Sequence, residues 1–434
     1  MNAHADSDAL TRANQEFTRD HPGDSGLRQP VHVLYGGAHL FRSDSARRMG
    51  AIAEKMLAEY APYAAALAAA TGIPPKLADT VYARVIEKLR REPVEDLRLD
   101  FEDGYGVRPD REEDATADSA AAEVAKGFAE GTLPPFLGIR IKPLNEEMRQ
   151  RSFRTLDRFL NALLDRTGGL LPANFVITLP KITVPAQVAA LMDALDGHVA
   201  RKLERCRDIA VEIMVETPRS LFILPALIEA ARGRCVAAHF GPYDYMASLG
   251  IAGSYQKITH STAFFARSMM QASLAGTGVR LANGPTNRLP MPVHRGESLS
   301  GEQVAENRAA VHDAWRTHCR DIRYSLYNGF FQSWDLHPAQ LVSRYAAVYS
   351  FFLEEIETTS ERLRNFIGKA AQATEVGGVF DDAATGQGLL NFFLRAINCG
   401  AIEERDTPAL TGLSIEELRS ASFTKILEGR RTAV

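Results

Sequence analysis

The chain alternates between short apolar runs and longer stretches with helical periodicity. Eight short runs are rich in β-branched and aromatic residues, and each leads into a helical pattern or a loop. We expect strands at residues 31–35, 96–102, 136–142, 175–181, 209–215, 235–240, 279–285 and 330–338. We expect helices at residues 43–70, 80–91, 110–130, 148–166, 220–232, 261–274 and 301–328. This alternation predicts an α/β fold, a (β/α)8 TIM barrel, although doubly wound open sheets also alternate.

The two ends of the chain depart from this alternation. Residues 1–30 are polar and predict a flexible N-terminal arm, and residues 31–345 are expected to form the TIM-barrel domain. From about Ala339 onward only helical pattern remains, with glycine-rich breaks at Gly377-Gly378 and at residues 386–388. We therefore expect a C-terminal helical extension over residues 346–434 that covers the barrel mouth or mediates contacts in a homo-oligomer.

Composition narrows the class of protein. The 434 residues are 45% hydrophobic and 24% charged, which is typical of a large globular enzyme. The net charge of −4 and the lack of a basic block argue against a nucleic-acid partner, and no apolar run approaches the length of a membrane span. The N-terminus has no apolar segment and the four cysteines show no CxxC spacing, so we expect a cytoplasmic protein without a zinc site.

The stretch from residue 209 to residue 250 organises the expected site. It predicts a strand, a helix and a second strand, and the two strands lead into Glu216 and Asp244. A βαβ unit requires parallel strands, so both carboxylates emerge at the same edge of the sheet. Two carboxylates side by side repel each other unless a cation lies between them.

Polar residues at the carboxyl ends of barrel strands indicate catalysis, and we expect the layers beneath them to be apolar. The strand ends supply Asp100, Glu102, Asp103, Arg140, Lys142, Lys181, Glu216, Asp244, Asn283, Asp335 and His337. Mg²⁺ prefers oxygen ligands and takes only one or two protein carboxylates, so Glu216 and Asp244 suffice. A single carboxylate at a strand end could equally well form an ordinary ion pair with a nearby arginine or lysine. The whole set of acidic and basic residues favours an active site.

The basic candidates leave alternatives open. Arg140 lies in an otherwise apolar strand, where its fork suits a substrate oxygen or a buried salt bridge to Asp100 or Glu102. Lys181 would form a Schiff base if desolvated, but we favour donation to carboxylates. His239 and His337 are weaker acid–base candidates, because a histidine at a strand end is more often a hydrogen-bonding residue.

Six motifs occur in a characteristic order: DFEDG, GIRIKP, LPKI, VEIMVETP, FGPYDYMASLG and WDLHPAQ. Together they resemble the citrate lyase β-subunit, malyl-CoA lyase and 2-oxo-acid aldolase group of the phosphoenolpyruvate/pyruvate barrel superfamily. The resemblance covers roughly residues 31–352. It implies a Mg²⁺-dependent barrel enzyme, with Mn²⁺ as the alternative metal, that makes or breaks a carbon–carbon bond through an enolate.

The resemblance also implies roles for individual residues. Glu216 and Asp244 match the two metal ligands, and Arg140 matches the arginine that binds the oxo or thioester oxygen and neutralises the enolate. Glu102 and Asp103 match the acidic pair that organises metal-bound water. The other expected site residues are Lys181 in catalysis and, in substrate binding, Asp100, Gly241, Pro242 and His337.

Two departures from the family pattern bear on the substrate. The first strand, VHVLYGGAHLF, lacks the arginine of coenzyme A-using members, and residues 254–290 are unusually long and polar. We therefore expect a divergent subgroup that acts on a free 2-oxo acid, such as pyruvate or oxaloacetate, rather than an acyl-CoA thioester. The alternatives are phosphoryl chemistry on phosphoenolpyruvate with Lys181, Arg288 or Arg295, Schiff-base chemistry at Lys181, and a non-catalytic protein that binds a small acid.

Overall fold

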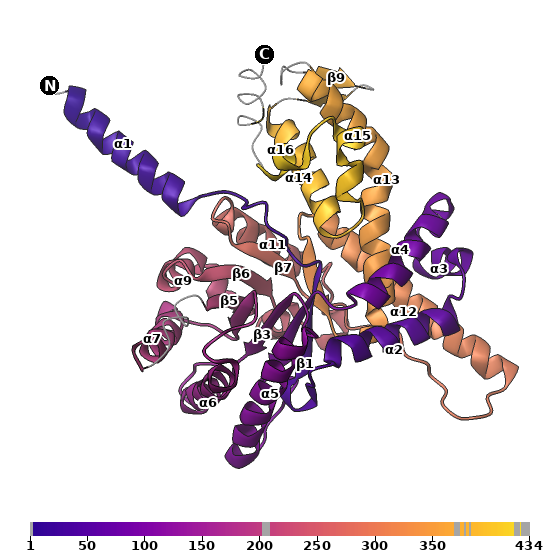
Figure 1. Cartoon of the computed structure of the whole chain (residues 1–434), viewed down its shortest axis with the longest axis horizontal. Helices are drawn as coiled ribbons and strands as arrows, with labels where there is room; N and C mark the ends of the chain where they lie inside the picture. The colour runs from indigo at the N-terminus through magenta and orange to yellow at the C-terminus, as the bar shows by residue number, and fades with distance from the viewer. Residues whose placement is uncertain are drawn as a thin grey trace.

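In the computed structural model, eight parallel strands close into a barrel in chain order. Figure 1 shows the barrel strands with helices around them. The structure describes residues 3–201, 209–368, 374–376, 379–381, 383–420 and 426. The strands are β1 (His32–Gly37), β2 (Asp96–Asp100), β3 (Phe136–Arg140), β4 (Phe175–Leu179), β5 (Ala210–Val215), β6 (Cys235–Phe240), β7 (Arg280–Asn283) and β8 (Gln332–Asp335). The predicted TIM barrel is confirmed. Five strands end two or three residues earlier than predicted, β5 and β6 end as predicted, and β1 ends two residues later.

Helices surround the barrel. They are α2 (Ser45–Tyr60), α3 (Ala64–Thr71), α4 (Ala78–Arg91), α5 (Asp110–Glu130), α6 (Arg149–Thr167), α7 (Pro185–Arg201), α8 (Pro218–Leu221), α9 (Leu224–Ala230), α10 (Pro242–Ser248), α11 (Ser261–Leu274) and α12 (Gly301–Tyr327). The sequence prediction missed α7 and α10. None of the helices in the described ranges combines the length and apolarity that a membrane-spanning segment needs.

Prolines divide two helices that the sequence predicted as continuous. The helix expected at residues 43–70 is interrupted between α2 and α3, where Pro62 lies, and the one expected at 220–232 is interrupted before Pro225. Proline has no backbone N–H and a fixed φ, so it fits the beginning of a helix and not its interior.

The N-terminal arm contains a helix and an anchored segment. Helix α1 (Ala3–Asp20) projects away from the barrel (Figure 1). The segment after it is fixed to the barrel: Arg28 forms an ion pair with buried Glu95 at 3.0 Å, and the Gln29 side chain donates to the Leu281 carbonyl at 3.1 Å. The end of the arm is thus held at the amino-terminal edge of the strands.

The C-terminal extension packs on that same edge. Helix α13 (Leu341–Gly368) crosses the predicted domain boundary at residue 345, and its Tyr345 hydroxyl donates to the carbonyl of Pro93, just before β2, at 2.8 Å. Arg395 of α14 (Ala383–Asn398) donates to Gln29 at 2.8 Å. The described extension therefore does not cover the mouth of its own barrel, which lies at the opposite, carboxyl edge.

Two further details of the extension correct the sequence prediction. A short antiparallel hairpin, β9 (Thr374–Val376) and β10 (Val379–Asp381), follows α13, where only helix was expected. The predicted break at residues 386–388 is wrong, because these residues lie inside α14. A Cβ on Gly386 would collide with the Phe366 ring, so this glycine permits close helix packing. The break predicted at Gly377-Gly378 lies outside the described residues.

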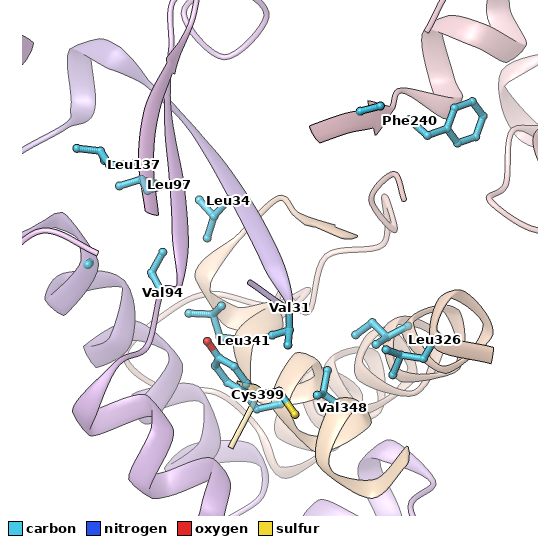
Figure 2. Packing of buried hydrophobic residues seen from close by; sticks show 14 of the residues in the cluster. Val31, Leu34, Val94, Leu97, Leu137, Phe240, Leu326, Leu341, Val348 and Cys399 are labelled. Atoms are coloured by element: carbon cyan, nitrogen blue, oxygen red, sulfur yellow. The ribbon is translucent and has the colours of Figure 1, made fainter. Parts of the chain in front are cut away.

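The main apolar core lies between the outer face of the barrel and the helices. Figure 2 shows Val31 and Leu34 of the first strand region beside Leu341 and Val348 of α13, with Cys399 nearby, and all five are buried. At about 25 cal/mol per Å² of apolar area, this packing is the main stabilising term of the barrel. The last elements of the described chain are α15 (Thr407–Thr411) and α16 (Ile415–Arg419), which extend the same core through residues such as Leu418.

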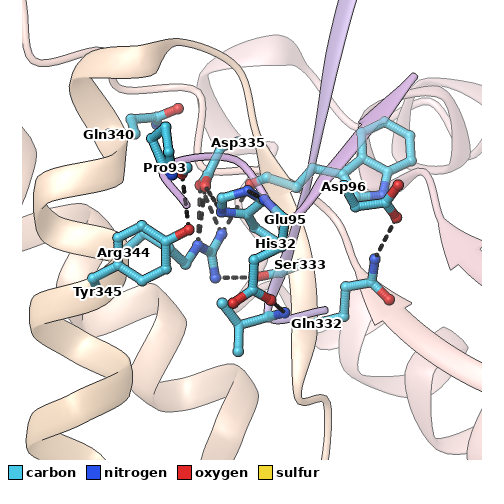
Figure 3. A network of polar contacts seen from close by, with 12 residues as sticks. His32, Pro93, Glu95, Asp96, Gln332, Ser333, Asp335, Gln340, Arg344 and Tyr345 are labelled. Atoms are coloured by element: carbon cyan, nitrogen blue, oxygen red, sulfur yellow. Dashed lines mark hydrogen bonds and ion pairs between the residues drawn. The ribbon is translucent and has the colours of Figure 1, made fainter. Parts of the chain in front are cut away.

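A buried polar network fixes α13 to the strands (Figure 3). Asp335, fully inaccessible at the end of β8, accepts from Arg344 of α13 at 2.7 Å and lies 3.2 Å from His32 and 3.0 Å from His318. Arg344 also donates to Ser333 at 2.7 Å. The prediction that Asp335 belongs to the mouth is wrong, since its oxygens face α12 and α13.

Candidate active site

The barrel interior beneath the mouth is charged, contrary to the expectation of apolar layers. Arg98 of β2 crosses the barrel to Glu212 of β5, with Nη2–Oε1 2.5 Å and Nε–Oε2 3.0 Å, and also binds Asp96. Thr178 of β4 donates to Glu212 at 2.8 Å. Burial alone would raise the pKa of the Glu212 carboxyl, but the Arg98 guanidinium outweighs burial and the pKa is lowered to about 2. The Arg98 guanidinium lies between the Asp96 and Glu212 carboxylates and offsets the energetic cost of burying their charges.

Arg140, at the end of β3, is the central cation of the mouth. Its Nε and Nη2 donate to Asp100 Oδ1 and Oδ2 at 2.7 Å and 2.5 Å, and its Nη1 lies 3.1 Å from Glu102. Its guanidinium also lies 4.8 Å from the centre of the Tyr35 ring. The predicted salt bridge is present with both acids, and a bidentate pair of this kind fixes the orientation of the fork.

The loop after β2 folds around Asp100. The Asp100 carboxylate accepts from the backbone N–H of Glu102 at 2.9 Å and of Gly104 at 2.6 Å. A Cβ on Gly104 would lie 2.6 Å from Asp100 Oδ2, so only glycine permits this approach. Asp100 is therefore occupied on both oxygens, and it presents Glu102 and Asp103 to the mouth.

Lys181, after β4, contacts acidic residues that follow two other strands, β2 and β6. Its ammonium donates to Glu102, lies 3.0 Å from Asp103 and is 3.9 Å from Asp244. Its partial burial would lower the pKa of the amine, but Glu102 and Asp103 raise it above its ordinary value. Lys181 thus donates to carboxylates, as favoured from the sequence, and remains an ammonium.

The acidic pair after β2 is electrostatically unequal. Burial raises the pKa of Glu102, and the neighbouring charge of Asp103 adds to this effect. Burial also acts on Asp103, but Arg140 and Lys181 outweigh it and lower the pKa of that carboxyl. The side chain of Asp103 is 58% exposed against 7% for Glu102, so Asp103 is the acid that faces solvent.

Glu216 follows β5 and is buried, with only 1% of its surface accessible. Its Oε1 accepts from the backbone N–H of Lys181 at 2.6 Å. Burial, reinforced by the charge of Asp244, raises the pKa of Glu216 to about 8. A Cβ on Gly241 would lie 2.6 Å from Glu216 Oε2, so the glycine leaves room for this oxygen. Such a carboxylate favours a nearby cation.

Glu216 and Asp244 fit a hard divalent cation. Asp244 lies in the first turn of α10, with its side chain 45% exposed. Among the described residues, no group of three or more His, Cys, Asp or Glu side chains is arranged to hold a metal ion. Mg²⁺ usually takes one or two protein carboxylates and completes its shell with water or substrate oxygens, so the predicted pair would be sufficient for it.

Gly241 and Pro242 form the turn beside this pair. The Gly241 N–H donates to the Val215 carbonyl at 3.0 Å, so the turn continues the pairing of β5 and β6. Pro242 is the first residue of α10 and contacts Gly284, the residue after β7. The turn brings α10 against the end of β5 and thus places Asp244 at the mouth.

Several residues predicted at the mouth point elsewhere. Lys142 donates to the Phe101 carbonyl at 2.6 Å and pairs with Glu113 of α5 at 3.1 Å. Asn283 donates to Ser325 at 2.8 Å. His239, a weaker acid–base candidate, is fully buried below the mouth. His337 follows β8 and accepts from Ala339 N–H as a helix cap, and its role in substrate binding stays a prediction. Arg288, a candidate phosphate donor, pairs with Asp313 beside a separate hollow of about 300 Å³.

Tyr35 is the residue that sequence reasoning missed. It lies in β1, and it contacts Arg140 of β3 and His239 of β6 across the barrel, so its side chain points inward. Period-2 alternation from Val33 would have predicted this direction. A tyrosine within an otherwise apolar strand does not by itself indicate a functional residue.

Comparison with known proteins agrees with this architecture. A family model described as "Domain of unknown function (DUF6986)" matches residues 10–426. A citrate lyase from Burkholderia xenovorans LB400 is 19% identical, with a TM-score of 0.57, over 88% of this chain and 96% of that chain. Protein CitE from Mycobacterium tuberculosis, in complex with magnesium, acetoacetate and coenzyme A, is 14% identical, with a TM-score of 0.50, over 86% and 99%.

At these identities the similarity to solved structures shows a shared fold. The resemblance to citrate lyase barrels found in the sequence motifs is confirmed at that level. No curated protein matches the chain.

Proposed function

This chain belongs to the family described as Domain of unknown function (DUF6986), and we propose that it is a Mg²⁺-dependent carbon–carbon lyase or aldolase. The substrate would be a pyruvate-type 2-oxo acid that reacts through its enolate. The observation that carries the proposal is the position of Arg140: it is fixed by Asp100 beside an acidic mouth that also holds Glu216 and Asp244.

Each of these residues has a role in the proposed reaction. Glu216 and Asp244 would hold the cation, which when bound supplies Lewis-acid stabilisation of negative charge on the substrate oxygen. Arg140 would bind the same developing charge, and a preorganised donor of this kind is usually the largest catalytic contribution. Asp100, with both oxygens occupied, positions Arg140 and does not itself bind substrate.

The proton would be handled by the acidic pair after β2. Asp103 is exposed at the mouth and kept anionic by Arg140 and Lys181, so it can accept a proton from the carbon next to the substrate carbonyl, directly or through water. Glu102, with its raised pKa, lies between Arg140 and Lys181 and orients both. This arrangement supports enolate formation at one end of the barrel.

The structural relatives support Mg²⁺ as the metal, but they do not decide which substrate forms the enolate. The CitE structure contains magnesium, acetoacetate and coenzyme A, which supports Mg²⁺ and a small oxo acid here. We propose a free 2-oxo acid rather than a thioester, because β1 of this chain lacks the arginine found in coenzyme A-using barrels of the resembling family.

The alternative chemistries have less support. Phosphoryl transfer needs converging donors, but Arg288 pairs with Asp313 and Lys181 is engaged by Glu102 and Asp103. A Schiff base needs a neutral amine, whereas the acidic neighbours raise the pKa of Lys181. Borohydride treatment with pyruvate should therefore leave Lys181 unmodified.

The test is proton NMR of deuterium exchange into the methyl groups of pyruvate, 2-oxobutyrate and acetyl-CoA. We expect exchange into a 2-oxo acid with Mg²⁺ present and none with excess chelator. Glu216→Gln should lower the rate by about 100-fold or more while the circular dichroism spectrum is unchanged. Absence of exchange with all three donors, or exchange that persists in the chelator, would contradict the proposal.

A further inference from the structure

A small apolar cluster interrupts the charged interior directly beneath Arg140. Tyr35 of β1, Met214 of β5 and Trp334 of β8 pack together there with Val33, separately from the main core. The rings of Tyr35 and Trp334 lie 4.6 Å apart, tilted by 35°. The strands β1 and β8 are neighbours, whereas β5 lies on the opposite side of the barrel, so Met214 meets the two rings in the barrel interior.

Tyr35 is held from two directions. Its ring lies under the Arg140 guanidinium, 4.8 Å from centre to Cζ, and its hydroxyl lies 3.0 Å from His239 Nδ1. Burial lowers the pKa of His239 to about 4, so the imidazole is neutral and its Nδ1 can accept from the phenol. A ring fixed at both its face and its hydroxyl cannot swing away from the mouth.

The ring is reached by solvent from one side. The side chains below it are closed off: Met214 and His239 are fully inaccessible and Glu212 is 2% exposed. Tyr35 itself keeps partial exposure. The accessible part of the ring therefore faces the mouth, where the Arg140 guanidinium lies above it.

We propose that Tyr35 is the specificity-determining residue of the mouth, and that its ring forms an apolar floor beneath Arg140 that limits the carbon chain of the 2-oxo acid. The inference rests on the proposed function, because Arg140 must bind the oxo acid for the chain to reach this floor. Donors with a methyl or ethyl group fit above the ring, whereas longer unbranched chains collide with it.

The experiment compares wild type with Tyr35→Phe and Tyr35→Ala. Binding of pyruvate, 2-oxobutyrate and 2-oxopentanoate is measured by calorimetry with Mg²⁺ present, so that turnover is not required. Tyr35→Phe keeps the ring and should retain the wild-type order of affinities. Tyr35→Ala should improve the affinity for 2-oxopentanoate relative to pyruvate by about tenfold or more, since one methylene group in a fitted pocket has an effect of this size.

The outcomes are distinguishable. An unchanged affinity ratio in Tyr35→Ala, with binding intact, would overturn the inference and leave the proposed function standing. Failure of wild type to bind any of the three acids would overturn both. Tyr35→Leu serves if the alanine variant does not fold: it leaves a smaller space and should shift the ratio in the same direction by a smaller factor.

Discussion

The backbone N–H of Lys181 donates to Oε1 of Glu216 at 2.6 Å, while the ammonium of the same lysine binds Glu102. Lys181 has a φ of +50°, a left-handed conformation that is uncommon for a residue with a side chain. This backbone conformation lets one residue orient a candidate metal ligand with its main chain and an acidic pair with its side chain. The two functions can be separated by substitution.

Lys181→Met should retain cation binding and lose catalysis. The substitution preserves the backbone N–H that orients Glu216 but removes the positive charge beside Glu102 and Asp103. We expect a Mn²⁺ affinity within about threefold of wild type and an exchange rate reduced by about 100-fold or more. Calorimetry with Mn²⁺ and NMR exchange measure the two quantities. A parallel loss of both would show that the side chain also shapes the cation site.

Gly241→Ala should weaken cation binding without unfolding the protein. The new Cβ would lie 2.6 Å from Oε2 of Glu216, so the carboxylate must move. Displacement of one of two protein ligands should reduce Mg²⁺ affinity by about tenfold or more. Gly253→Ala is the matched control, because nothing lies within 4 Å of a Cβ there. Equal affinities in the two variants would contradict the assignment of Glu216.

His239 should make the protein less stable as the pH falls. Burial lowers its pKa from 6.5 to about 4. Between these values the unfolded chain binds a proton that the folded chain does not, so the free energy of unfolding decreases as pH falls through this window. The full effect is about 3 kcal/mol, at about 1.4 kcal/mol per pKa unit.

Urea unfolding at pH 7 and pH 5 measures this effect. The loss of stability between the two pH values should be smaller in His239→Gln than in wild type, because glutamine does not titrate. Glu216, whose pKa is raised to about 8, has the opposite effect in this window, but it does so in both proteins and cancels in the comparison. The acids whose pKa is lowered, such as Glu212, contribute mainly below pH 5. An identical loss in both proteins would mean that His239 is charged when folded.

We expect Asp335→Asn to lower the free energy of unfolding and to leave the exchange rate of the folded protein unchanged. Asp335 is fully buried and balances the charge of Arg344 between β8 and α13. Removal of its charge leaves a buried guanidinium uncompensated, which typically costs about 3–5 kcal/mol. At a temperature where the variant is folded, its exchange rate should match wild type. If the variant lost activity but kept the stability of wild type, Asp335 would have a role in the active site.

The local sequence pattern was sufficient to predict several helices and strands and part of the candidate active site. Helices α5 and α11 have the predicted bounds, and β6 does as well, because periodicity and nearby glycine or proline residues fix such limits. The candidate acids Glu102, Asp103 and Asp244 meet around Lys181, since the carboxyl ends of parallel strands share one edge. Local pattern failed at Gly386, where the glycine serves a distant contact with Phe366 rather than a turn.

The residue pattern was enough to predict the alternation of strands and helices, and with it a barrel whose acidic loops emerge at one end. Which polar side chains lie at that end depends on contacts that form only in the folded barrel. Arg98 pairs with Glu212 and Tyr35 lies beneath Arg140, both between strands far apart in the chain, whereas Asp335 pairs with Arg344 of the helix that follows it. Strand periodicity fixes the face on which a side chain lies, but its partner depends on barrel closure and helix docking, which bring distant charges within hydrogen-bonding distance.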